Sequence, residues 1–147
     1  MDQIKVIAKK VIGAQNIMAF KDLCRYVLWR LKGMPVPAHG IYKRSVIKKY
    51  AKKHKLGVFL QPGTAGGGTV VHLEKYFKRL YTIELDPTLY LQGKTLVQDS
   101  KKIICIEGDS GVMIKEILQK VDEPVLFWLD AHYSGYGTAR GAVDTPI

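Results

Sequence analysis

Four short segments of the chain place glycines, carboxylates and a histidine directly after apolar runs. They are residues 62–69 (PGTAGGGT), 84–86 (ELD), 108–110 (GDS) and 130–132 (DAH). Glycine lets a ligand approach the backbone closely, a carboxylate accepts hydrogen bonds from hydroxyl and amino groups, and imidazole takes up a proton near neutral pH. The four segments together are typical of a site for a ligand that carries hydroxyls and amines.

The glycine-rich loop and the carboxylate that follows it have the spacing of a nucleotide site. Gly63, Ala65 and Gly68 satisfy the G-x-G/A-x-x-G pattern, and Glu84 lies 21 residues after Gly63, where a ribose ligand is expected. This spacing leaves nicotinamide and adenosyl cofactors equally open. A tight turn without a ligand is the alternative for the loop, and a solvated charge or a helix cap is the alternative for Glu84.

Two aspartates at the ends of predicted strands have capping interpretations as well. Asp86 precedes Pro87, so we predict that it is an N-cap without a role in chemistry. Asp109, followed by Ser110, either accepts a hydrogen bond from an exocyclic adenine amine or caps the next helix. Both interpretations of Asp109 stay open at this point.

Asp130 and His132 follow the most apolar run of the chain, residues 125–129 (VLFWL). A strand of that kind is a rigid support, and an imidazole beside a carboxylate suits a general base or a substrate contact. Structural hydrogen bonding and a Mg²⁺-like ion are the alternatives. Because two ligands do not make a metal site, we predict no metal.

The segments that position these residues alternate regularly between short apolar runs and amphipathic stretches. Strands are predicted at residues 58–61, 80–84, 103–106 and 125–129, and helices at residues 69–77, from residue 87 and at residues 112–121. Such alternation predicts an α/β fold with a Rossmann-like, open and mainly parallel sheet. In this fold ligands bind at the carboxyl ends of the strands, where all four segments lie.

The charge divides the chain into two predicted parts. Residues 1–57 hold 14 of the 23 lysines and arginines and only two acidic residues, whereas residues 58–147 are nearly neutral. The first part follows helical spacing up to Leu31, is stopped by Gly33 and continues with a helix over residues 42–54 that ends at Gly57 as C-cap. We therefore predict a basic helical N-terminal extension, residues 1–57, before a Rossmann-like half domain, residues 58–147.

Length and composition indicate the class of protein, its expected location and the state of its cysteines. A length of 147 residues with 47% hydrophobic and 24% charged residues is typical of a single globular domain. No apolar run approaches the roughly 20 residues of a membrane-spanning helix, and no secretion signal is recognisable, so a cytoplasmic location is expected. The two cysteines, Cys24 and Cys105, are predicted to be buried free thiols.

The segments VFLQPGTAGGG, YTIELDPTLY, IEGDSG and FWLDAHYSG, in that order, resemble the class I S-adenosylmethionine-dependent methyltransferases, especially small bacterial ones. The resemblance covers roughly residues 35–147. It implies a sheet in the order 3-2-1-4 that is the first part of a seven-stranded one. Gln61 stands where the family usually has an acidic residue, and Pro62 removes a backbone donor from the same turn.

The resemblance implies S-adenosylmethionine as cofactor and assigns roles to residues. Its methionine part would lie against the loop of Gly63, Thr64, Gly66 and Gly67, its ribose on Glu84, and its adenine on Asp109 and Ser110. Asp130 and His132 would face the methyl acceptor, an oxygen or nitrogen of a small, sugar-like molecule.

Two other functions are compatible with the sequence. The basic extension could instead bind nucleic acid or an anionic surface without catalysis, although no stacking pattern of aromatic residues supports nucleic acid. A nicotinamide-dependent Rossmann enzyme is the third. We also expect the apolar strand at residues 125–129 to be a sheet edge, so that the chain alone either aggregates or forms an oligomer in which another copy covers this edge.

Overall fold

The computed structural model describes residues 17, 19–64 and 67–129. The chain divides into two compact units, Met1–Ser45 and Val46–Ile147. Among the described residues, no helix is long and apolar enough to cross a membrane.

The first unit contains a helix over residues 19–31, to which Ile17 also belongs, and the beginning of α2 (Gly40–His54). The first of these helices stops at Gly33, as the sequence predicts. Gly33 has a left-handed backbone with a φ of 78°, and its N–H donates to the Arg30 carbonyl at 3.1 Å.

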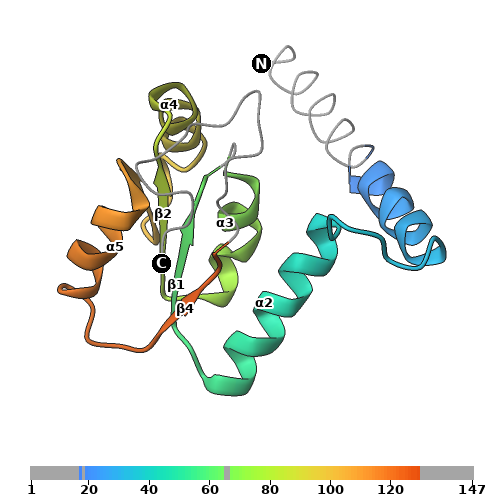
Figure 1. Cartoon of the computed structure of the whole chain (residues 1–147), viewed down its shortest axis with the longest axis horizontal. Helices are drawn as coiled ribbons and strands as arrows, with labels where there is room; N and C mark the ends of the chain where they lie inside the picture. Colours follow the sequence, from blue (N-terminus) through green and yellow to red (C-terminus); the bar gives the residue numbers. More distant parts are fainter. Residues whose placement is uncertain (1–16, 18, 65–66, 130–147) are drawn as a thin grey trace, which may run out of the picture. The chain divides into compact units, whose positions relative to one another are not determined.

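The second unit is built on a four-stranded parallel sheet (Figure 1). Its strands are β1 (Val58–Pro62), β2 (Arg79–Glu84), β3 (Ile103–Glu107) and β4 (Val125–Phe127), in the order β3-β2-β1-β4. The predicted α/β fold, the parallel arrangement and the strand order are confirmed.

Helices connect the strands and cover both faces of the sheet. They are α3 (Gly68–Leu73) with the 3₁₀ turn η1 (Glu74–Tyr76), α4 (Pro87–Leu96) and α5 (Ser110–Leu118). In Figure 1, α3 and α5 lie on opposite sides of the sheet. Asp86 caps α4 as predicted, because its Oδ1 accepts from Thr88 N at 2.8 Å and Leu89 N at 2.9 Å.

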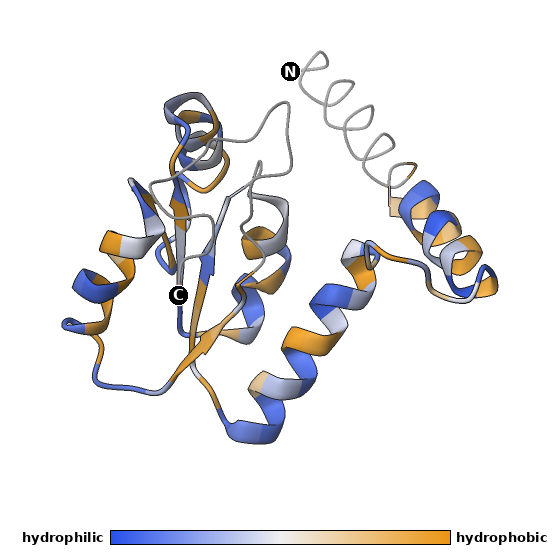
Figure 2. Ribbon diagram, in the orientation of Figure 1, coloured by the Kyte–Doolittle hydropathy of each residue, from blue (hydrophilic) through white to orange (hydrophobic). Residues whose placement is uncertain are grey.

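The core consists of two apolar layers, one on each face of the sheet, and Figure 2 shows hydrophobic stretches along the strands. One layer joins the sheet to α2, α3 and the end of α4. Its buried members are Ile47, Ala51, Phe59, Val70, Leu73, Phe77, Leu80, Val97, Ile103 and Leu126. The other layer joins it to α5 and contains Val58, Leu60, Tyr81, Ile83 and Ile117. Ile47 and Ala51 of α2 belong to the first layer, and the second compact unit begins at Val46.

Three local predictions are wrong. Lys55, with a φ of 53°, takes the left-handed position after α2 that was assigned to Gly57, and Leu56 N then donates to the Ala51 carbonyl at 2.9 Å. Cys24 is exposed rather than buried, while Cys105 is half-buried, and both are free.

The strand expected at residues 125–129 is shorter and less buried than its composition predicts. Only Val125–Phe127 forms a strand, paired with β1 alone among the described strands, and Trp128 N extends the ladder by donating to the Leu60 carbonyl at 2.9 Å. The Phe127 and Leu129 side chains are exposed. In the described part of the chain, β4 is therefore an edge strand, hydrogen-bonded to β1 along one edge and unpaired along the other.

Candidate functional site

A row of polar side chains, buried at Gln61 and Thr82 and half-buried at Cys105, crosses the sheet near the carboxyl ends of its strands. Gln61 of β1 pairs in register with Thr82 of β2, and Thr82 pairs with Cys105 of β3. Side chains alternate between the two faces of a strand, so Gln61 and Thr82 share a face with the apolar Phe59 and Leu80. The row therefore forms a polar layer on top of the first apolar layer, where a ligand site is expected in this kind of sheet.

Glu84, at the end of β2, organises the loop that follows β1. Its side chain is only 6% exposed, which excludes the solvated-charge interpretation. Its Oε2 accepts from Thr64 N at 2.9 Å, and its Oε1 accepts from Leu85 N at 3.1 Å and Asp86 N at 3.2 Å. The cap of α4 is Asp86, so Glu84 links the glycine loop to the start of α4 without being its N-cap.

The loop after β1 has the backbone geometry that its glycines predict. Gly63 and Gly67 both have a φ of 75°, a backbone conformation that residues other than glycine rarely adopt. Gly63 N donates to the Ile83 carbonyl and Gly67 N to the Thr64 carbonyl, each at 2.8 Å. The loop is thereby tied to β2 on one side and closed on itself on the other.

Thr64 is the centre of this arrangement. It is 2% exposed, and its hydroxyl lies 2.8 Å from the hydroxyl of Thr82. Gly93 of α4 packs against it so closely that a Cβ at position 93 would lie 2.8 Å from Thr64 Cγ2. Thr82 and Gly93 were not recognised from the sequence, although a threonine within the apolar run LYTIE was a usable signal.

Asp109 caps α5, as one of its two interpretations predicts. Its Oδ1 accepts from Gly111 N at 2.8 Å, and Ser110 is the first residue of the helix. The preceding Gly108 has a φ of 143°, and its N–H donates to the Glu84 backbone carbonyl at 2.9 Å. The structure thus brings Asp109 and Ser110 to the same edge of the sheet as Glu84 and Thr64, which leaves the adenine contact as a prediction.

Cys105 lies next to this cluster. Burial raises the pKa of its thiol above the ordinary value, and the Glu84 carboxylate raises it further. A hydrogen bond with Thr64 and the charge of Lys94 act in the opposite direction on this pKa. A thiol of this kind stays protonated near neutral pH, so it is a structural group rather than a nucleophile.

Gln61 contributes the one buried side-chain nitrogen or oxygen atom that has no hydrogen-bond partner among the described residues. Its side chain is 6% exposed and its Nε2 donates to the Gly63 carbonyl at 2.8 Å, whereas its buried Oε1 finds no donor among the described residues. A buried acceptor without a partner costs free energy, and a ligand that supplies a donor removes that cost. From the sequence alone, Gln61 is recognisable only as a departure from the family pattern.

Several predicted site residues lie outside the described residues. They are Gly66 of the loop and the pair Asp130 and His132. Among the residues that the structure describes, no cluster of three or more histidine, cysteine or acidic side chains could hold a metal ion. Of the residues assigned to the cofactor, the structure brings together Gly63, Thr64, Gly67, Glu84, Asp109 and Ser110 at the carboxyl ends of β1, β2 and β3.

Comparison with known proteins found no matching family model and no matching curated protein. Among solved structures, the chain is similar to a Staphylococcus aureus protein assigned as a caffeoyl-CoA O-methyltransferase, with 16% identity, a TM-score of 0.48 and coverage of 74% of this chain and 54% of the other. It is also similar to the Streptomyces achromogenes O-methyltransferase TomG, involved in tomaymycin synthesis and solved with S-adenosylmethionine, with 18% identity, a TM-score of 0.46 and coverage of 69% and 50%.

A third similar structure is an O-methyltransferase from Bacillus cereus in complex with S-adenosylhomocysteine, with 13% identity, a TM-score of 0.48 and coverage of 73% and 53%. The chain spans about half the length of each of these three proteins. All three carry the name of an O-methyltransferase.

Proposed function

We propose that this chain is the cofactor-binding part of a methyltransferase that uses S-adenosylmethionine and a small acceptor. The proposal combines the motif resemblance with the polar cluster at the carboxyl ends of β1 and β2. The methyl group would go to an oxygen or nitrogen of the acceptor, for which a sugar-like molecule is our expectation.

The unpaired Oε1 of Gln61 is the observation that favours S-adenosylmethionine over a nicotinamide cofactor. It is a buried acceptor beside the Gly63 carbonyl, in a loop that the resemblance assigns to the methionine part of the cofactor. The ammonium group of that part is a donor without lone pairs and therefore fits an acceptor. The pyrophosphate of a nicotinamide cofactor carries only acceptors at the corresponding place, so two lone-pair groups would face each other. The donor set of this loop thus favours an adenosylmethionine over a dinucleotide.

Glu84 has a double role in this proposal. Its carboxylate holds the Thr64 N–H and the first residues after β2, which fixes the loop in the conformation needed for binding. The resemblance assigns the ribose hydroxyls to the same carboxylate, and the edge at Asp109 and Ser110 would receive the adenine.

S-adenosylmethionine, when bound, supplies an electrophilic methyl group on its sulfonium sulfur. The residues of the chain mainly align the reactants, because methyl transfer is an in-line displacement that depends on orientation. The acceptor must also lose a proton, for which we propose His132 or Asp130 after the apolar strand β4.

Calorimetric titration with S-adenosylhomocysteine, S-adenosylmethionine and NAD tests the proposal. We expect binding of the first two and none of NAD. Gln61→Leu should lower the affinity for S-adenosylhomocysteine about tenfold, the usual result of losing a hydrogen bond to a charged group. Gln92→Leu, on the exposed surface of α4, is the matched control and should bind normally. Binding of NAD alone, or an unchanged affinity in a folded Gln61→Leu protein, would contradict the assignment.

A further inference from the structure

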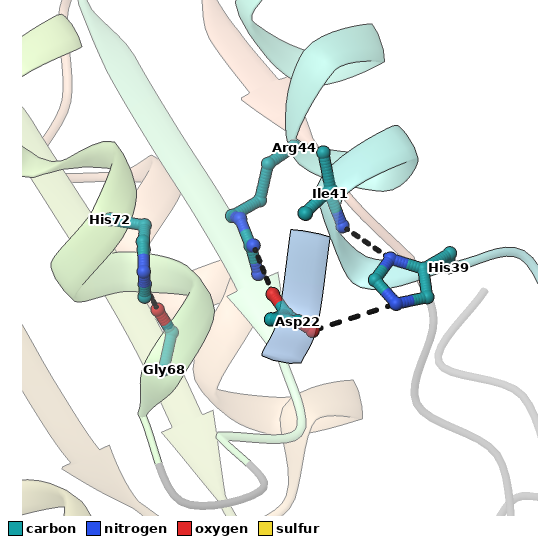
Figure 3. Close-up of polar contacts among 6 residues, drawn as sticks. All are labelled: Asp22, His39, Ile41, Arg44, Gly68 and His72. Atoms are coloured by element: carbon teal, nitrogen blue, oxygen red, sulfur yellow. Dashed lines mark hydrogen bonds and ion pairs between the residues drawn. The ribbon is translucent and has the colours of Figure 1, made fainter. Parts of the chain in front are cut away.

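The helix over residues 19–31, together with Ile17, carries its polar contacts on one side. Asp22 Oδ2 lies 3.4 Å from Arg44 Nη2, and Asp22 Oδ1 lies 3.5 Å from His39 Nε2 (Figure 3). His39 Nδ1 in turn accepts from Ile41 N at 3.3 Å, which places the ring proton on Nε2, toward Asp22. The carboxylate therefore anchors this helix to the segment that begins α2.

Aromatic contacts extend the same side of the helix. Trp29 Nε1 donates to the Pro35 carbonyl at 2.7 Å, and the Trp29 ring lies 5.4 Å from the Tyr42 ring and 6.0 Å from the Tyr26 ring, measured between centroids. Asp22, Tyr26 and Trp29 are spaced four and three residues apart, so they share one face. That face is occupied within the first unit.

The opposite face is apolar and exposed. At about 3.6 residues per turn, the residues that point away from Asp22, Tyr26 and Trp29 form a continuous apolar sector. Its members are Ile17, Phe20, Cys24, Val27, Leu28 and Leu31. Phe20 is 66% exposed and Leu31 is 79% exposed. A sector of this size needs a partner, because contiguous exposed apolar patches mark interaction sites.

Basic residues border this sector. Lys21 and Arg25 follow it on one side of the helix and Arg30 on the other. Asp22 is the only acidic residue among described residues 17–45, and it lies on the occupied face. The surface that surrounds the apolar sector is thus positive without compensation.

We propose that this apolar sector docks in the plane of a lipid surface that carries anionic headgroups. Apolar side chains enter the boundary of the acyl region in such helices, and flanking lysines and arginines meet the anionic headgroups. A second copy of the same helix fits poorly, because pairing two apolar sectors would bring Lys21, Arg25 and Arg30 of both copies together without acidic partners. Charge complementarity therefore selects the anionic bilayer.

The test is co-sedimentation of the full chain with phosphatidylcholine vesicles that do or do not contain phosphatidylserine. We expect binding only with phosphatidylserine, and weaker binding as salt increases, because screening acts on exposed charges. The double variant F20Q/L31Q should lower the partition coefficient at least about tenfold, and R25Q should lower it about fivefold. L91Q/V112Q is the matched control, because Leu91 and Val112 are comparably exposed on α4 and α5.

A fluorophore on Cys24 adds a readout of depth. The raised pKa of the Cys105 thiol slows its alkylation, so Cys24 is labelled preferentially. We expect a blue shift of the label emission with phosphatidylserine vesicles and none with F20Q/L31Q. Far-UV circular dichroism checks that each variant is folded.

Three results would overturn the proposal. One is the absence of binding to phosphatidylserine vesicles at low salt. Another is a dimer in sedimentation that F20Q/L31Q dissociates, with no vesicle binding by the unaltered chain, which would assign the sector to a second copy. The third is binding to vesicles, or to a single-stranded oligonucleotide, that R25Q weakens and F20Q/L31Q leaves unchanged, because the apolar sector would then have no part in it.

Discussion

Replacement of Glu84 by alanine should destabilise the second unit more than any other single change of an acidic residue at the ends of its strands. Three backbone N–H groups donate to this carboxylate, those of Thr64, Leu85 and Asp86, at 2.9, 3.1 and 3.2 Å. The bond from Thr64 is buried, and the other two are partly accessible to water. Glu84→Ala removes all three acceptor contacts at once.

The size of the effect follows from the burial of each donor. An unsatisfied buried donor costs about 1–3 kcal/mol, and the two partly accessible N–H groups, which water can reach, add about 0.5 kcal/mol each. We therefore expect the free energy of unfolding to fall by about 2–4 kcal/mol. That is a large share of the roughly 5–15 kcal/mol typical of a folded domain.

Urea denaturation followed by circular dichroism measures this change, and hydrogen exchange at the Thr64 amide reports the lost contact directly. Glu107→Ala is the matched control, because Glu107 pairs in register with Glu84 at the end of β3 but is exposed. It should change the free energy of unfolding by less than about 0.5 kcal/mol. Equal effects of the two variants would refute the view that Glu84 organises the loop. In addition, S-adenosylhomocysteine should bind Glu84→Ala more weakly by about 1–3 kcal/mol, measured by calorimetry at a temperature where the variant is folded.

Four further expectations can be checked separately. Asp109→Asn should lower stability and S-adenosylhomocysteine affinity less than Asp109→Ala, because asparagine keeps the N-cap acceptor; equal losses in calorimetry would point away from recognition. Substitution of His132 or Asp130 should lower turnover and leave cofactor affinity nearly unchanged, and the reverse pattern would exclude both as proton acceptors. Alkylation of Cys105 should rise with pH only above the range of a free thiol, because its raised pKa keeps the thiolate scarce until then; a profile like that of a small thiol would contradict the burial argument. Sedimentation should show that copies of the chain associate through the edge strand β4, whereas a monomer with a stable but freely exchanging β4 would show that the edge needs no cover.

The sequence was informative wherever one residue type satisfies a local physical demand. Short apolar runs and amphipathic stretches predicted the strands and helices of the second unit, and Asp86 before Pro87 predicted the start of α4. The end of α2 at His54 agrees with the prediction, but the left-handed position after it falls on Lys55 rather than Gly57. A lysine gives no local sequence signal for a left-handed backbone, so the fold imposes that conformation.

Contacts between distant segments were not predictable in the same way. The polar row of Gln61, Thr82 and Cys105 depends on strand register, and the approach of Gly93 to Thr64 depends on how α4 packs. The sequence around each of these residues contains no motif that marks it as part of a site. They come together only when three strands and a helix assemble. A site of this kind is therefore recognised from sequence by its glycines and carboxylates and not by the groups that support them.

The close approach of Gly93 to Thr64 has a thermodynamic consequence for the candidate site. Thr64 is held between the Glu84 carboxylate and α4, with no room for a larger side chain at position 93. The loop conformation and the docking of α4 therefore form one cooperative unit, and neither can change without the other. By linkage, any ligand that stabilises the loop also reduces local opening of α4, and any substitution that loosens α4 lowers ligand affinity from a position that the ligand never touches.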